Sequence, residues 1–188
     1  MNEEFENLKE SCLNCEKCEL CKGRKNVVFG VGNPKAKVMF VGEGPGEQED
    51  IQGEPFVGKS GQLLDKYLFL TGLDRKENIY IANIVKCRPP KNRDPKPQEQ
   101  DICIEYLRKQ VKLIKPRIIV CLGRIAAQKL ISPDFRVTAD HGRFFEKGGI
   151  LFMATFHPSA LLRNAENNPL ALSDFQALRN KIAELGIF

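Results

Sequence analysis

The chain has 188 residues, of which 42% are hydrophobic and 28% are charged, a balance typical of globular proteins that excludes disordered and collagen-like chains. Its longest apolar runs, such as residues 118–122, are far shorter than the roughly 20 residues of a membrane-spanning helix, so we expect no membrane association. The formal net charge of +5 makes the chain mildly basic, which is compatible with a polyanionic partner.

The first distinctive segment is rich in cysteine. Four of the seven cysteines recur at every third residue: Cys12, Cys15, Cys18 and Cys21. Cys87 and Cys103 flank a later basic loop and the start of the helix that follows it. Four thiolates from these two regions could bind a [4Fe–4S] cluster or Zn²⁺, and spacing alone does not choose the metal or the four ligands. Cys121 lies in an apolar run and is expected to be a packed thiol.

Four short apolar runs rich in β-forming residues predict buried strands. In chain order they cover residues 37–41, 78–85, 117–122 and 150–155. The pattern also predicts a helix that Ser60 caps and Gly72 ends, followed by helices over residues 98–115, 123–131 and 172–185. The glycines and aromatic residues of 142–149 predict a turn before the last strand.

Residues 86–97 form a basic, proline-rich segment that predicts a loop, because proline prevents regular backbone pairing. Its basic residues are Lys86, Arg88, Lys91, Arg93 and Lys96. They could be an ordinary solvated surface or a site that binds phosphate groups.

Strands that alternate with helices predict one α/β domain over residues 1–188, a three-layer α/β/α sandwich around a mostly parallel four-stranded sheet. Ligands of such sheets bind beyond the carboxyl ends of the strands. The segment from Gly42 to Gly46 follows the first predicted strand, Asn83 lies near the end of the second, and His157 follows the fourth. We therefore expect these three segments to meet at one rim of the sheet.

Each candidate residue at this rim has a structural and a functional interpretation. The glycines Gly42, Gly44 and Gly46 permit either a tight turn or close approach of a ligand, and they match neither nucleotide-binding glycine motif, so we expect no nucleotide cofactor. Phe56, between glycines, could be core or a stacking platform. The Asn83 amide could bond to the backbone or read the edge of a base. His157 lacks the partners of a hydrolase triad but could donate a hydrogen bond to developing negative charge.

Four motifs give a resemblance to a known family. VGEGPGEQED, GEPFVGKSGQLL, YIANIVKCRPPKNR and FHPSALLR resemble the motifs of the family 4 uracil-DNA glycosylases, the iron–sulfur type of bacteria and archaea. The likeness extends from about Cys15 to the final helix. It implies an enzyme that hydrolyses the N-glycosidic bond of flipped-out deoxyuridine in DNA and so initiates base excision repair.

The resemblance also implies roles for individual residues. The segment from Gly42 to Gly46 would line the uracil pocket, with Glu43 in the catalytic motif and with Gly46 and Glu47 forming a wall that excludes thymine. Phe56 would stack on uracil, Asn83 would read its edge, and His157 would lie beside its O2 atom. The cluster ligands would be Cys15, Cys18, Cys87 and Cys103. A structural [4Fe–4S] cluster would thus join segment 12–21 to loop 86–103.

Contacts to DNA are expected from residues near the rim: Lys86, Arg88, Ser159, Leu161 and Arg163. Leu161 is the candidate wedge that fills the gap left by the flipped base, although it could equally be a core residue at the start of a helix. A relative that binds uracil-containing DNA covalently has a histidine in the corresponding loop. Residues 86–103 contain no histidine, which favours an enzyme that turns over instead of binding its product covalently.

Two other functions fit parts of the pattern: a non-catalytic DNA-binding or uracil-binding module with a metal staple, and a small iron–sulfur redox protein. The first ten residues are acidic and contain no apolar stretch, so we expect no secretory signal and a cytoplasmic, nucleoid-associated protein. A monomer is expected, since a duplex must reach the rim. The C-terminal LGIF is too weak a pattern to predict binding to a sliding clamp.

Overall fold

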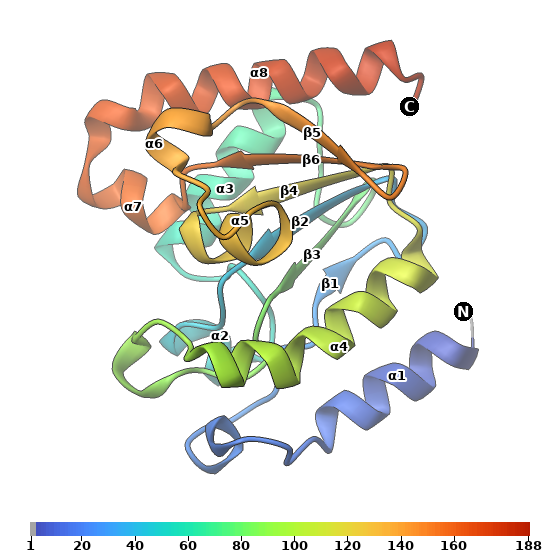
Figure 1. The fold of residues 1–188 in the computed structure, drawn as a ribbon, viewed down its shortest axis with the longest axis vertical. Helices are drawn as coiled ribbons and strands as arrows, with labels where there is room; N and C mark the ends of the chain where they lie inside the picture. The colour runs from blue at the N-terminus through green and yellow to red at the C-terminus, as the bar shows by residue number, and fades with distance from the viewer. Residues whose placement is uncertain (1–2) are drawn as a thin grey trace.

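The computed structural model describes residues 3–188, which form one six-stranded sheet with helices on both sides (Figure 1). The strand order is β1-β3-β2-β4-β6-β5. The strands are β1 (Val31–Gly32), β2 (Val38–Gly42), β3 (Ile79–Asn83), β4 (Ile118–Leu122), β5 (Phe144–Lys147) and β6 (Ile150–Thr155). The four central strands are parallel, and β1 and β5 pair antiparallel at the two edges.

Helices connect the strands and cover both faces of the sheet. The α-helices are α1 (Glu3–Leu13), α2 (Glu47–Gln52), α3 (Lys59–Leu70), α4 (Pro97–Ile114), α5 (Arg124–Leu130), α6 (Val137–Asp140), α7 (Pro158–Arg163) and α8 (Asn168–Glu184). The short 3₁₀ helices are η1 (Glu19–Lys22), η2 (Pro90–Asn92) and η3 (Ala165–Asn167).

The three-layer sandwich and its four parallel strands are confirmed, but the sheet has six strands instead of four. The missed β1 is only two residues long, too short for an alternating pattern. The predicted turn at 142–149 is instead the hairpin of β5 and β6, turned at Gly148 and Gly149 with φ values of +60° and +76°. Two consecutive positive φ angles suit this tight hairpin and explain the paired glycines.

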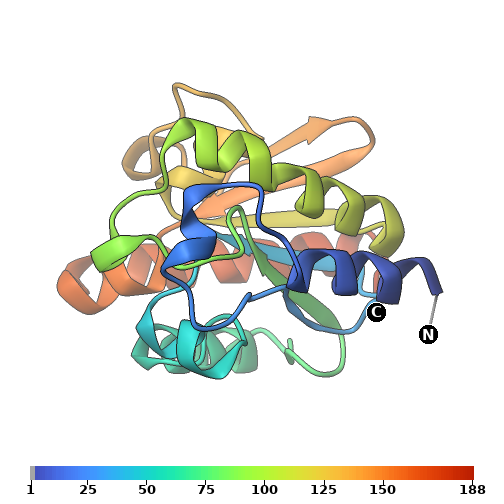
Figure 2. The ribbon, with the colours of Figure 1, turned by 90° about the horizontal axis from the view of Figure 1, so that it is seen from below.

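Each central strand is buried on both faces, so it appears in the sequence as a continuous apolar run. Successive side chains of β2 point to opposite sides: Met39 and Val41 pack with α1 and α4, and Val38 and Phe40 pack with α3 and α8. Figure 2 shows the two helical layers on either side of the sheet.

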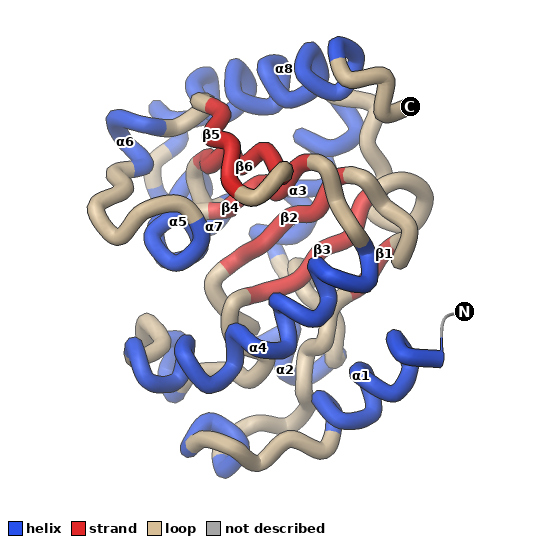
Figure 3. Tube along the Cα trace, turned by 45° about the vertical axis from the view of Figure 1, so that its right-hand side comes forward, coloured by secondary structure: helices blue, strands red, loops and turns tan. Residues whose placement is uncertain are grey.

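Helices α3 and α1 differ from the sequence prediction. Helix α3 begins at Lys59, with Gly58 instead of Ser60 at the N-cap position. Helix α1 was not predicted; it buries Phe5, Leu8 and Cys12 against the core beside α4. Figures 1 and 3 show the cysteine-rich loop after α1 beneath the first turns of α4.

The chain order places a crevice at the carboxyl ends of the strands. From β2 the chain moves outward to β3 and then crosses back to β4 on the other side of β2. Such a switch point leaves the loops after β2 and β4 to diverge, and ligands of open α/β sheets bind there. No helix within residues 3–188 has the length and apolar character needed to cross a membrane.

Candidate active site

A cavity of about 690 Å³ lies at this rim of the sheet. Its walls include most of the predicted site residues: Glu43, Gly44, Gly46, Glu47, Phe56, Asn83, His157, Ser159 and Arg163. They come from the segments after β2, β3 and β6 and from the loop before α3. The predicted meeting of three strand-end segments is therefore present.

Phe56 and Asn83 meet at Gly42, at the end of β2, and His157 lies beside Phe56. A Cβ atom at position 42 would lie 2.5 Å from Asn83 Oδ1 and 2.7 Å from Phe56 Cζ, so any residue larger than glycine would displace one of them. The rings of Phe56 and His157 are 5.6 Å apart between centroids. An aromatic ring, an amide and an imidazole thus line one cavity.

The backbone at Asn83 is held in place, while the side-chain acceptor has no partner. Asn83 is 1% exposed at the end of β3, and its Oδ1 atom is buried without a hydrogen bond. A buried polar atom without a partner is rare and costs roughly 1–3 kcal/mol, so such an atom commonly marks a ligand position. The backbone is fixed because Ile84 N donates to Gly42 O over 2.9 Å.

His157 is set as a neutral donor. The backbone N–H of Ser159 donates to His157 Nδ1 over 3.1 Å, and Ser159 Oγ lies 2.7 Å from the same atom. Because Nδ1 accepts, the proton of the neutral ring is on Nε2. Burial, with a contribution from the positive charge of Arg163, lowers the pKa of His157 to about 4. At neutral pH the ring can donate a hydrogen bond without carrying charge.

Glu43 is the acidic group of the loop after β2. Burial and the negative charge of Asp94 raise its pKa to about 7, and Arg124 partly opposes this shift. Val85 N donates to the Glu43 carbonyl over 3.1 Å, which ties this loop to the segment after β3. A carboxyl group with a pKa near neutrality can accept or donate a proton under physiological conditions.

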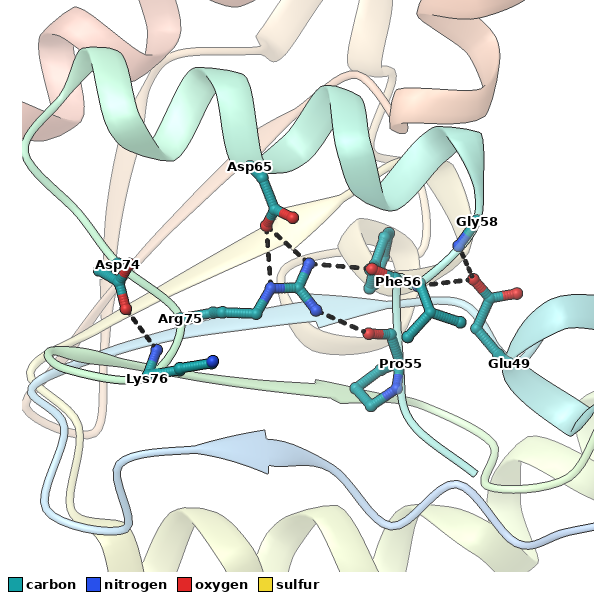
Figure 4. A network of polar contacts seen from close by, with 9 residues as sticks. Glu49, Pro55, Phe56, Gly58, Asp65, Asp74, Arg75 and Lys76 are labelled. Carbon is teal, nitrogen blue, oxygen red and sulfur yellow. Dashed lines mark hydrogen bonds and ion pairs between the residues drawn. The ribbon is translucent and has the colours of Figure 1, made fainter. Parts of the chain in front are cut away.

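Phe56 occupies a constrained loop before α3. Its φ is +54°, a left-handed conformation that costs a non-glycine residue roughly 1–2 kcal/mol. Glu49 Oε1 accepts hydrogen bonds from the backbone N–H groups of Val57 and Gly58, at 3.0 and 3.1 Å (Figure 4). The carboxylate of Glu49 on α2 thus fixes the backbone of the two residues that follow Phe56.

Lys86 is buried, whereas the sequence prediction placed it in contact with DNA. It is 1% exposed, and its Nζ donates to Gln110 Oε1 over 2.7 Å and to the Asn83 carbonyl over 3.0 Å. Burial lowers the pKa of Lys86 to about 8. The ammonium supports the strand that carries Asn83 and is out of reach of a phosphate.

Leu161, the predicted wedge, is 2% exposed and packs in the core with α3 and α8, which favours its alternative interpretation as a core residue. Replacing Leu161 with alanine should lower the free energy of unfolding by about 2–5 kcal/mol, the usual cost of a cavity at a buried leucine. Chemical denaturation measures this change. A stability equal to that of the unaltered protein would mean that Leu161 does not pack as described. The exposed leucine of α7 is Leu162, at 51%.

The remaining predicted DNA contacts differ in their surroundings. Arg163 and Ser159 line the cavity, and Ser159 also orients His157. Arg88 lies outside the lining; its Nε donates to Asn92 Oδ1 over 2.8 Å, and its Nη1 lies 3.6 Å from Glu47 Oε1.

The lining residues that the sequence analysis missed include Glu49, Gly123 and Arg124. Gly123 and Arg124 follow β4, so the rule that strand ends meet would have found them. Gly123 has a φ of +89°, and a Cβ there would lie 2.8 Å from His157 Cβ. No sequence pattern pointed to Glu49, because its hydrogen bonds depend on how the loop before α3 folds.

A separate small cavity is lined by six cysteines: Cys12, Cys15, Cys18, Cys21, Cys87 and Cys103. The backbone N–H of Lys86 donates to Cys103 Sγ over 3.3 Å, and Arg24 donates to Cys87 Sγ over 3.4 Å. Burial raises the pKa of Cys103 to about 11, a shift that the nearby Lys86 partly offsets. Cysteine sulfurs that accept hydrogen bonds from N–H donors fit an iron–sulfur cluster, which binds them as thiolates.

Within residues 3–188, no three His, Cys, Asp or Glu side chains are grouped so that they could hold a single metal ion. This finding concerns a site such as zinc, in which all ligands bind one ion. A [4Fe–4S] cluster is larger and takes one thiolate at each iron, so its cysteines lie farther apart.

The chain resembles known proteins over nearly its whole length. Residues 29–183 match the family model described as the Uracil DNA glycosylase superfamily. A type-4 uracil-DNA glycosylase of Archaeoglobus fulgidus is 43% identical over 191 residues, which cover 97% of this chain and 94% of the relative. Those of Thermotoga maritima and Sulfurisphaera tokodaii are 42% and 41% identical, over 97% and 93% of this chain and 96% and 83% of the relatives. The chain therefore belongs to the uracil-DNA glycosylase superfamily and, within it, to the type-4 group.

Proposed function

We propose that this protein is a uracil-DNA glycosylase that hydrolyses the N-glycosidic bond of deoxyuridine in DNA and so starts base excision repair. The observation that carries the proposal is the unpartnered, buried Oδ1 of Asn83 beside Phe56 and His157 in one cavity. The residues of the cavity supply what base excision needs: a platform, an edge reader and a hydrogen-bond donor. The base must leave the duplex stack to reach them, at a cost of a few kcal/mol.

Asn83 reads the edge of the base. Its Oδ1 accepts from uracil N3–H, and its Nδ2 donates to O4. Cytosine presents an acceptor at N3 and a donor at N4, so the fixed amide would oppose both groups. A buried site left with unpaired polar groups rejects the wrong ligand by about 10⁴-fold or more. Gly46 and Glu47 line the cavity, which supports the proposal that they exclude the methyl group of thymine.

His157 stabilises the leaving group. As the glycosidic bond breaks, the sugar gains oxocarbenium character and uracil leaves as an anion. The Nε2–H of neutral His157 donates to O2, where negative charge develops. A fixed donor of this kind stabilises the transition state more than the ground state, because the charge is absent before the bond breaks.

Glu43 receives the proton of the water that attacks C1′ of the sugar. Because its carboxylate form acts as the base, the excision rate should rise with pH through about 7 and then level off. In Glu43→Gln, the rate should fall and this rise should disappear. Single-turnover excision measured between pH 5 and 9 tests both effects. A variant that keeps the inflection near pH 7 would remove Glu43 from this role.

The cysteine cavity would hold a [4Fe–4S] cluster through Cys15, Cys18, Cys87 and Cys103. The cluster would be structural, joining the segment after α1 to the loop before α4. Cys103→Ser should lose the broad visible absorbance of the cluster and unfold at a lower temperature, whereas Cys21→Ser, the control, should keep both. If Cys21→Ser loses the absorbance and Cys103→Ser keeps it, the ligand set is wrong.

Uracil-containing DNA, single- or double-stranded, is the proposed partner, bound by a monomer. Arg163 lies in the cavity wall, where its guanidinium can pair with a backbone phosphate near the flipped nucleotide. Because such contacts release counterions, binding should weaken as salt rises.

Base release from a synthetic strand tests the function. The cluster-loaded protein should convert a uracil-containing oligonucleotide to an alkali-labile abasic strand without added metal or nucleotide, and should leave thymine, cytosine and hypoxanthine controls intact. Salt-sensitive DNA binding with no base release would support a binding module instead. Reversible reduction under mild reductants with no excision would support a redox protein.

A further inference from the structure

The loop that carries Phe56 is held from outside the cavity by Arg75, which no motif singled out. Arg75 Nη2 donates to the Phe56 carbonyl over 2.9 Å, and Nη1 donates to the Pro55 carbonyl over 3.2 Å. Asp65 on α3 fixes the guanidinium, with Oδ1 at 2.9 Å from Nε and 2.7 Å from Nη2. Figure 4 shows Arg75 lying between Asp65 and the two carbonyls.

Arg75 is itself presented by an ordered turn between α3 and β3. Asp74 Oδ1 accepts from the backbone N–H groups of Lys76 and Glu77, at 2.7 and 3.2 Å. Asn78 Oδ1 accepts from Asp74 N over 2.9 Å. The side chain of Arg75 is only 16% exposed, so this turn aims it inward at the loop.

The peptide at Phe56 needs this support. Its φ of +54° is strained for a phenylalanine. Its carbonyl lies so close to α3 that a Cβ at Gly61 would be 1.8 Å from the oxygen. Arg75 binds the carbonyls on one side of this strained residue, and Glu49 binds the N–H groups of Val57 and Gly58 on the other.

We propose that Arg75, fixed by Asp65, is a positioning residue that, with Glu49, forms a clamp that holds the Phe56 loop in its strained conformation. The loop in turn keeps the aromatic ring in the position where uracil stacks on it. This inference rests on the proposed function. Arginine suits the task because its planar fork binds two carbonyls at once, whereas lysine offers a single point of attachment.

The test compares three variants. Arg75→Met removes the clamp, Arg75→Lys restores part of it, and Arg117→Met is the control. Arg117 also donates to a backbone carbonyl, that of Leu185, over 3.0 Å. It lies just before β4, at the amino ends of the parallel strands, whereas the cavity lies at their carboxyl ends. The control therefore removes the same charge and the same kind of contact far from the cavity.

Single-turnover excision, inhibition by free uracil and binding to uracil-free DNA are measured for each. Arg75→Met should excise about 10- to 100-fold more slowly, as expected when a contact group is misplaced, and should be inhibited less by uracil. Its affinity for uracil-free DNA should match that of Arg117→Met, and Arg75→Lys should recover part of the rate. A rate and inhibition equal to those of the unaltered protein, or equal losses in both arginine-to-methionine variants, would overturn the proposal.

Hydrogen exchange separates this proposal from the proposed function. The amides of Val57 and Gly58 should exchange faster in Arg75→Met than in Arg117→Met, whatever the enzyme does to DNA. If the unaltered protein releases no uracil, the proposed function fails while faster exchange still supports the clamp. Unchanged exchange at both amides would refute the clamp.

Discussion

Asn83→Asp is expected to reduce the preference for uracil over cytosine from about 10⁴-fold or more to near parity. Aspartate keeps an acceptor at the position of Oδ1 but replaces the Nδ2 donor by a second oxygen. That oxygen repels uracil O4 and accepts from the N4 amino group of cytosine. The protonated form of the buried carboxyl can also donate to cytosine N3. Uracil excision should therefore fall while cytosine excision becomes measurable.

The measurement is single-turnover excision from matched strands that differ only at the target base. Asn83→Ala is the control: it removes both contacts and should slow uracil excision without creating cytosine excision. An Asn83→Asp variant that keeps the full preference for uracil would remove Asn83 from the role of reader. The unpartnered Oδ1 atom would then need another explanation.

His157→Ala is expected to slow excision by about 10²- to 10³-fold, the usual effect of losing one donor to a developing oxyanion. Its affinity for DNA should change little, because the donor acts on charge that appears only as the bond breaks. Since the pKa of His157 is lowered to about 4, protonation of this ring should not limit the rate of the unaltered enzyme above pH 5.

The same pKa predicts a loss of stability in acid. The unfolded chain takes up the proton near the ordinary pKa of about 6.5, whereas the folded chain does so only near 4. Between these values the unfolded state binds more protons, so stability should fall as the pH drops from 6.5 to 4. This part of the fall should be absent in His157→Ala.

In the excision and DNA-binding measurements, equal losses of rate and of DNA affinity in His157→Ala would make His157 a structural residue.

The sequence predicted the parts of the fold that depend on local pattern. The four parallel strands are buried on both faces, so they appear as apolar runs with little ambiguity. The convergence of the segment from Gly42 to Gly46 with Asn83 and His157 followed from the rule that parallel strands end at one rim, whereas the place of Phe56 was implied only by the family resemblance. The edge strands β1 and β5 were missed because they are short and only partly buried.

What the sequence did not reveal depends on long-range packing. Lys86 lies in a basic segment, yet the fold turns its side chain inward to Gln110, 24 residues later. Leu161 and Leu162 are neighbours with the same side chain, and which one is buried depends on the face of α7 that packs against the core. Arg75 had no motif at all, because its carbonyl partners are 19 and 20 residues away along the chain.

The most direct test of the uracil pocket is a crystal structure of the protein with free uracil. The base should lie on the Phe56 ring, with N3–H donating to Asn83 Oδ1, O4 accepting from Asn83 Nδ2, and O2 accepting from His157 Nε2. Uracil bound at another place, or bound in this cavity without a contact to Asn83, would contradict the account.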